Sequence, residues 1–252
     1  MMKKKLITFL CALTVFLLAG CLYPDDKRAE NQVPYADQLV SVQQAVDQFY
    51  SDTGVLPIQT RDQSVIVYQR YPVDFRQLVP RYMQQPPGNS FESGGIYQYV
   101  LFNVEEEPEV KLIDLRSQRE MNQVQRKLND YMRRHTYAPV KDILDVGLFS
   151  LDYEKLGYNE EPLVPSPYSD TYLPLIFTNT GEVMIDYRLE LNRVLQQNEG
   201  NVEYKPGEDI RDLLLGDSPF VPAYSIPYTI DSKGEPIYDM SLPNQYELGE
   251  SE

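Results

Sequence analysis

The chain has 252 residues and a formal net charge of −15, with 23 Lys and Arg against 38 Asp and Glu. Such an acidic chain is expected to repel nucleic acid and anionic lipid, since binding either depends on clustered basic side chains. Two cysteines, Cys11 and Cys21, and one histidine, His135, are present. This scarcity argues against disulfides, zinc sites and histidine-based nucleophilic catalysis.

The N-terminal segment has three parts in a fixed order. Three lysines (residues 3–5) precede a short apolar span (6–18), and two small residues stand directly before Cys21. This order resembles the signal peptide of bacterial lipoproteins. The resemblance implies that residues 1–20 are removed and that Cys21 is acylated, leaving an extracytoplasmic protein anchored to the cell membrane by lipid. An uncleaved transmembrane helix is the alternative, but such a helix needs about 20 apolar residues.

A polar tether and a helix are predicted next. Residues 21–34 are largely polar and charged and show no apolar period. Residues 35–50 carry apolar side chains at intervals of three and four, which predicts an amphipathic helix. Gly54 and Pro57 are expected to end it.

Parts of the chain resemble one another. Residues 42–57 align without gaps on residues 124–139, sharing a Val-Gln pair and a proline, and a weaker third copy starts at Leu191. Each copy is followed by a predicted short helix, at residues 74–79, 141–146 and 209–214. A predicted β-hairpin comes next, pairing residues 97–102 with 110–114, 173–177 with 183–187, and 225–230 with 236–240.

These elements predict an α+β fold of about three tandem repeats, each made of a helix, a short helix and an antiparallel β-hairpin. An acidic tail is expected after the last repeat. The predicted boundaries are 35–116, 117–188 and a partial 189–243 for the repeats and 244–252 for the tail.

Residues 39–57 contain the corner Tyr-x-Asp-Thr-Gly-x-x-Pro. This stretch is similar to the end of the long helix in type IV pilins and pseudopilins, and the similarity extends to residue 102 through Leu78–Tyr82 and the turn at Pro87-Gly88. It implies a helix packed on a sheet. A lipoprotein signal and a tether occupy the place of the pilin N-terminal helix, so filament assembly is not implied.

The whole chain also looks like poorly characterised lipoproteins of spore-forming Gram-positive bacteria. The residues that carry this resemblance are the segment before Cys21, the run Ser166–Ser169 and the predicted turn at 178–183. It implies surface anchoring and says little about chemistry.

Carboxylates gather at two places, Glu105–Glu107 with Glu109 and the pair Glu160-Glu161. Two carboxylates suffice for glycoside hydrolysis, but acids in predicted loops beside proline are more simply a solvated face. A calcium loop is not favoured, because the most similar segment, 231–235, contains Lys233. We predict no metal or cofactor.

Tyrosine is abundant, with 20 residues and no tryptophan in the chain. Tyr153, Tyr158, Tyr168 and Tyr172 form the predicted interaction surface, because tyrosine suits protein and sugar interfaces. The alternative is that tyrosine fills half-buried strand positions. His135 follows two arginines and is predicted to lie near a helix end rather than in an active site.

The sequence therefore predicts a non-enzymatic, lipid-anchored envelope protein that binds another envelope protein or wall glycan through an acidic, Tyr-rich surface. Two alternatives remain open. One is a carboxylate-based cell-wall hydrolase, and the other is a ligand-binding lipoprotein that serves a transporter.

Overall fold

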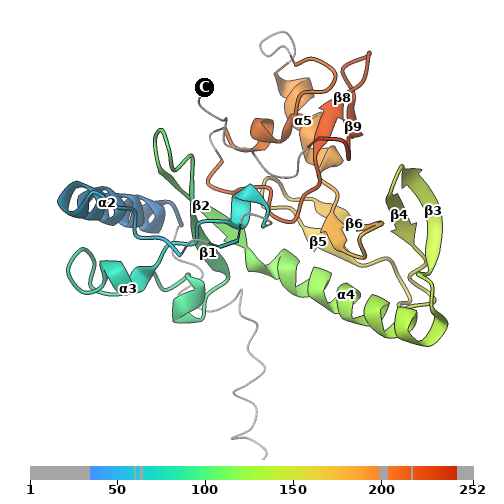
Figure 1. Cartoon of the computed structure of the whole chain (residues 1–252), viewed down its shortest axis with the longest axis horizontal. Coiled ribbons are helices and arrows are strands. Elements are labelled where there is room, and N and C mark those ends of the chain that lie inside the picture. The colour runs from blue at the N-terminus through green and yellow to red at the C-terminus, as the bar shows by residue number, and fades with distance from the viewer. Residues whose placement is uncertain (1–34, 60, 63–64, 199–203, 217, 243–252) are drawn as a thin grey trace, which may run out of the picture.

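The computed structural model shows a mixed α+β fold with antiparallel sheets (Figure 1). Cys21, the predicted signal and tether, and the predicted acidic tail lie outside the described residues. Within the described part of the chain, no helix is long and apolar enough to cross a membrane. The structure describes residues 35–59, 61–62, 65–198, 204–216 and 218–242.

The first helix packs on the first hairpin. Helix α2 (Tyr35–Thr53) lies against β1 (Tyr97–Phe102) and β2 (Glu109–Asp114), which pair in antiparallel register. Val42 and Val46, one turn apart on α2, are completely buried in this contact. The helix and both strands are confirmed at the predicted places.

The chain between α2 and β1 is mostly irregular. It contains the short helix α3 (Phe75–Leu78) and the 3-10 turns η4 (Val67–Gln69) and η5 (Phe91–Ser93). The carboxylate of Asp74 accepts the backbone N–H of Arg76 and so caps α3. The first of the predicted short helices is thus confirmed.

Helix α4 (Leu115–His135) starts directly where β2 ends. Asp114 is its cap residue and accepts the N–H of Arg116. The helix ends at Thr136, which caps it in the left-handed conformation with φ of 64°. Its last residue is His135, which the sequence predicts to lie near a helix end.

The second sheet follows the order β3-β4-β6-β5, with β7 beside β6. The apolar stripe of α4, which includes Val124 and Leu128, joins the core of this sheet. The strands are β3 (Val140–Asp145), β4 (Leu148–Leu151), β5 (Leu163–Pro165), β6 (Tyr172–Thr178) and β7 (Val183–Ile185).

One predicted short helix is wrong. Residues 141–145 instead belong to strand β3, in which Ile143 pairs with Phe149 of β4. Gly147 turns the chain back with φ of 77°, a conformation that costs glycine little. Pairing across this turn, together with β-branched side chains, overrides the local helical pattern. The predicted repeat of helix, short helix and hairpin therefore does not hold in its second copy.

The C-terminal part contains one more helix and a short hairpin. Helix α5 (Arg188–Gln197) and the 3-10 turn η6 (Arg211–Leu214) come before β8 (Tyr228–Ile230) and β9 (Pro236–Tyr238). Both strands are shorter than predicted. Figure 1 shows these elements at the top of the molecule, with α2 at the left and α4 along the lower right.

One C-terminal segment joins the two larger hairpins. The N–H of Leu112 in β2 donates to the carbonyl of Pro219 over 2.8 Å, and the N–H of Ile185 in β7 donates to that of Tyr224 over 2.9 Å. Buried Lys111 donates to the carbonyl of Ser218 over 2.8 Å. The segment therefore runs along both hairpins, although the sequence predicted a separate third repeat.

Candidate functional site

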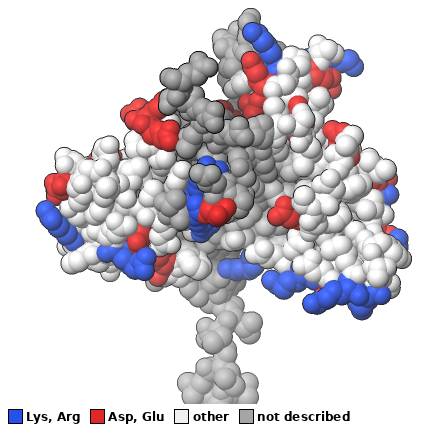
Figure 2. Space-filling view, viewed as in Figure 1, with Lys and Arg blue, Asp and Glu red and all other residues white. Residues whose placement is uncertain are grey.

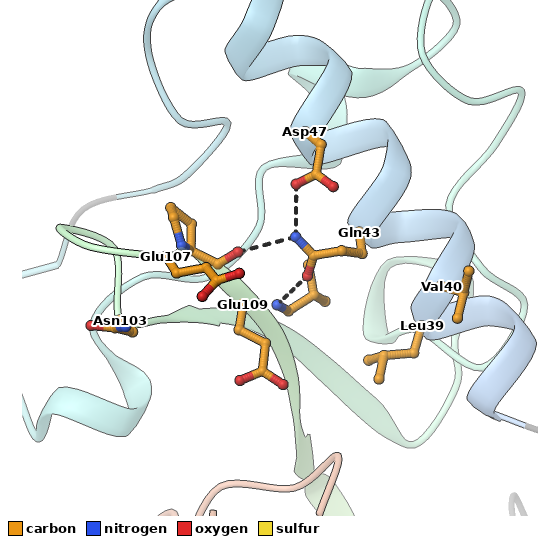
Figure 3. Close-up of a pocket in the computed structure, with 9 residues that line it drawn as sticks. Leu39, Val40, Gln43, Asp47, Asn103, Glu107 and Glu109 are labelled. Carbon is orange, nitrogen blue, oxygen red and sulfur yellow. Dashed lines mark hydrogen bonds between the residues drawn. The ribbon is translucent and has the colours of Figure 1, made fainter. Parts of the chain in front are cut away.

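A hollow of about 600 Å³ lies between α2 and the loop of the first hairpin (Figure 3). The amide of Gln43 on α2 lies within it. Its Nε2 donates to Asp47 Oδ1 over 2.8 Å and to the carbonyl of Pro108 over 3.0 Å, and its Oε1 accepts the N–H of Val110 over 2.7 Å. Gln43 thus fastens the helix to the hairpin.

The hollow brings together three carboxylates, two of them from the acidic loop singled out in the sequence. Asp47 is held by the amide of Gln43, and Glu109 pairs with Lys111 at 2.8 Å. Figure 3 shows Gln43 between Asp47 and the backbone beside Glu107. Asp47 and Glu109 therefore bind other protein groups, and these contacts account for the positions of both carboxylates without a catalytic role.

A second hollow, of about 380 Å³, lies at the end of β4. It contains Glu160 and Glu161 together with Tyr153 and Tyr158. The ammonium of Lys127 lies 3.8 Å from the ring centre of Tyr158, a cation–π contact that ties α4 to this loop. The structure thus joins one predicted carboxylate pair with two predicted tyrosines.

The four tyrosines of the predicted surface have different surroundings. Tyr153 lies in the core and its hydroxyl donates to the carbonyl of Leu175 over 3.1 Å. Tyr158 and Tyr168 are half-buried against the core. Burial raises the pKa of both Tyr153 and Tyr168. Only Tyr172 of the four is mainly exposed, at 63%.

Gln125 on α4 repeats the contact that Gln43 makes on α2. Its Nε2 donates to the carbonyl of Gly181 over 2.9 Å and to the side chain of Asn129 over 3.0 Å. Its Oε1 accepts the N–H of Val183 over 2.7 Å. The sequence alignment pairs these two glutamines, but their role as fasteners between helix and hairpin emerges only from the structure.

An Asp-x-Arg motif, which the sequence reasoning missed, occurs at four turns. In each copy the aspartate accepts the N–H of the arginine two residues later and also binds its guanidinium. The Arg76 side chain lowers the pKa of Asp74 to about 2. The Asp-x-Arg spacing occurs at all four turns, and this repetition in the sequence could have revealed the motif. The pairs are Asp74 with Arg76, Asp114 with Arg116, Asp186 with Arg188, and Asp209 with Arg211.

Glu190 on α5 is 1% exposed and lies at the centre of a polar cluster. Its Oε1 accepts hydrogen bonds from Ser166, Ser169 and Thr171, and its Oε2 pairs with Arg193. Burial acts to raise the pKa of Glu190, but the hydrogen bonds from Ser166, Ser169 and Arg193 together with the charge of Arg193 outweigh it, so the pKa is lowered. The run Ser166–Ser169 therefore has a structural role.

The remaining candidate chemistry concerns metal ions and His135. The described part of the chain contains no group of three or more His, Cys, Asp or Glu side chains that could hold a metal ion. The ring of His135 stacks on Tyr131 with their centres 4.2 Å apart, at the exposed end of α4. This position fits the structural role that the sequence predicts.

Comparison with known proteins gives one family match. Residues 35–114 match the YphF family N-terminal domain. No curated protein and no solved structure shows a significant match to the chain. The match starts at the first residue of α2 and ends at the last residue of β2, so the part of this chain that is similar to the YphF family N-terminal domain is the first helix with its hairpin.

Proposed function

We propose that the protein is a non-enzymatic lipoprotein of the cell envelope, anchored by acylated Cys21, that binds another envelope protein. The order of lysines, apolar span and small residues before Cys21 supports the anchor. The non-enzymatic role is supported by Asp47, Glu109 and Glu190, whose carboxylates have structural partners. A lipid anchor raises the local concentration at the membrane, so even a weak contact there is productive.

We also propose that the helix–hairpin units arose by duplication. The matching contacts of Gln43 and Gln125 support this relation, as do Asp114 and Asp186, which follow the second strand of each hairpin and precede the next helix. In this proposal α5 with its short hairpin is a reduced third copy.

The observation that carries the binding proposal is the edge strand β3. Among the described strands it pairs only with β4. Ile143 is 75% exposed and Val146, directly after the strand, is 86% exposed. Lys141, Asp142 and Asp145 of β3 are charged, so its exposed apolar side chains stand among charges. An unpaired strand edge with exposed apolar side chains is a template for strand addition from a partner, which gains main-chain hydrogen bonds and apolar contact together. We therefore place the partner at β3 rather than at the tyrosines.

The test is site-specific photo-crosslinking in native membranes, with the crosslinker at position 143 and, as a control, at exposed Phe91. We expect a defined membrane protein to be captured from position 143 only. Capture should fall when Val146→Asp is added and should be unchanged with Val55→Asp, which alters another exposed valine, 57% exposed and outside the sheet.

The same experiment in a Cys21→Ala chain tests the anchor. Loss of acyl labelling together with weaker capture is expected. Equal capture from positions 143 and 91, or acylation that persists without Cys21, would contradict the proposal.

A further inference from the structure

Basic side chains are concentrated on one helix of this acidic protein. Helix α4 carries six Lys and Arg and only two acids, Glu120 and Asp130. By contrast, α2 carries three aspartates and no basic residue. Figure 2 shows Lys and Arg along the lower edge of the molecule, where α4 lies in Figure 1. The net charge of the whole chain therefore does not describe this surface.

The basic residues of α4 share a face. Arg119, Arg126 and Arg133 recur every seven residues, which is two helical turns, so they lie in one row. All three are exposed and point away from the stripe that includes Val124 and Leu128, which is buried. Arg134 adds a further exposed guanidinium beside the row, while Asp130 pairs with Arg133. We call the exposed side chains of Arg119, Arg126, Arg133 and Arg134 the basic face.

The basic face starts close to the point where the chain from Cys21 enters the fold. The ring of Tyr35, the first residue of α2, lies 6.3 Å from that of Tyr97. Tyr97 pairs across the hairpin with Asp114, the cap of α4. The 14 residues from position 21 to 34 span at most about 50 Å, while α4 is about 32 Å long. A lipid at Cys21 can therefore coexist with the whole length of α4 on the same membrane.

We propose that the basic face of α4 binds the anionic surface of the bilayer that holds the lipid anchor. This inference rests on the proposed function, because it assigns the membrane of the anchor as the ligand of α4. Each Lys or Arg near an anionic surface strengthens binding, and several together are additive to a first approximation. Charges farther away than about 8 Å are largely screened at physiological salt. The acidic remainder of the protein then opposes this local contact only weakly.

The proposed membrane contact and the proposed partner contact use different parts of the molecule. The basic face holds α4 along the membrane, and four residues separate the end of α4 from the start of β3. In Figure 1 the β3–β4 hairpin rises from the far end of α4, away from the lower edge. Docking α4 therefore leaves the unpaired edge of β3 open to a second protein.

The test uses the unlipidated chain 22–252, which retains every contact described above, and vesicle flotation. Vesicles are either pure phosphatidylcholine or contain phosphatidylglycerol. The variant Arg126→Gln/Arg133→Gln/Arg134→Gln is compared with a control of equal charge, Arg61→Gln/Lys205→Gln/Lys233→Gln, whose exposed residues lie outside α4. Thermal melting of all three proteins establishes that they are equally folded.

The unmodified chain is expected to float with the anionic vesicles only and to lose binding at about 0.5 M salt. The α4 variant should lose affinity by on the order of 10- to 100-fold, while the control remains within about threefold. Equal binding to both kinds of vesicle, or equal losses in variant and control, would overturn the inference.

These outcomes are separate from those of the proposed function. The flotation experiment needs neither the acyl group nor a protein partner, and the crosslinking experiment reports on β3. If the protein is acylated and captures its partner but does not bind anionic vesicles, only the proposed membrane contact of the basic face is refuted.

Discussion

Helices α2 and α4 pack in the same way but face solvent differently. Each buries an apolar stripe against a hairpin, Val42 and Val46 in α2 and Val124 and Leu128 in α4. Each is fastened to its hairpin by a glutamine that bonds to the turn. The exposed side of α2, however, is acidic, whereas that of α4 is basic.

The shared features are those that helix packing requires, whereas the charge of the exposed face is not set by packing. The buried stripe and the glutamine are tied to the geometry of a helix on a hairpin, so they recur. The outer face makes no such contact, and its charge is free to serve another purpose. Comparing the two helices therefore isolates the basic face of α4 as a feature that packing does not explain.

The largest expected effect comes from the shared stripe. Leu128→Ala in α4 is expected to lower the free energy of unfolding by about 2–5 kcal/mol, because a fully buried side chain leaves a cavity. Val46→Ala in α2 should cost less, since it deletes fewer buried atoms. Urea denaturation measures both changes. Ile143→Ala, at an exposed position, is the control, and a Leu128→Ala cost as small as that of the control would refute the packing.

The next largest loss of stability is expected from the polar cluster around Glu190 on α5. Glu190→Gln removes a buried charge held by Ser166, Ser169 and Arg193, and we expect a loss of about 1.5–3 kcal/mol at pH 7. The pKa of Glu190 is lowered in the folded protein. Its contribution is therefore fully present above the usual glutamate value of 4.5 and is lost as the pH falls through the folded value.

Denaturation of Glu190→Gln and the unmodified chain at several pH values checks this. The difference in free energy of unfolding between the two proteins should be large at pH 7 and should become smaller as the pH falls below 4.5. A difference that stays constant, or becomes larger in acid, would show that the folded protein does not stabilise the ionised form of Glu190.

The two glutamines test the equivalence of α2 and α4 directly. Gln43→Ala and Gln125→Ala each leave a strand N–H without its acceptor, that of Val110 or that of Val183. We expect a loss of about 1–3 kcal/mol in each case. Gln44→Ala, at the neighbouring exposed position, should stay within about 0.5 kcal/mol. A large cost at one glutamine and none at the other would break the comparison.

The smallest effect is expected on the outer face of α4. Arg126→Gln should change the free energy of unfolding by no more than about 0.5 kcal/mol, because the residue is exposed. Thermal melting beside Arg81→Gln, another exposed arginine, measures this. A loss as large as that of Gln125→Ala would mean that the basic face serves packing after all.

Much of the fold could be predicted from local pattern. The apolar period of α2 and the two largely apolar runs on either side of the acidic loop were sufficient to place α2, β1 and β2. Residues 141–146 could not be assigned in this way, since their pairing with β4 depends on a turn at Gly147. Three of the four predicted surface tyrosines contact the core, because a half-apolar ring fits either environment.

The sequence by itself determined the lipoprotein-like segment ending at Cys21, the mixed α+β class and the alignment of the Val-Gln pairs. These are properties of local order along the chain. Only the tertiary structure decided that Gln43 and Gln125 fasten their helices to hairpins and that the arginines of α4 form one face. Such arrangements depend on which residues folding brings together. A net charge of −15 sums over the whole chain, whereas a membrane or a partner meets one surface at a time.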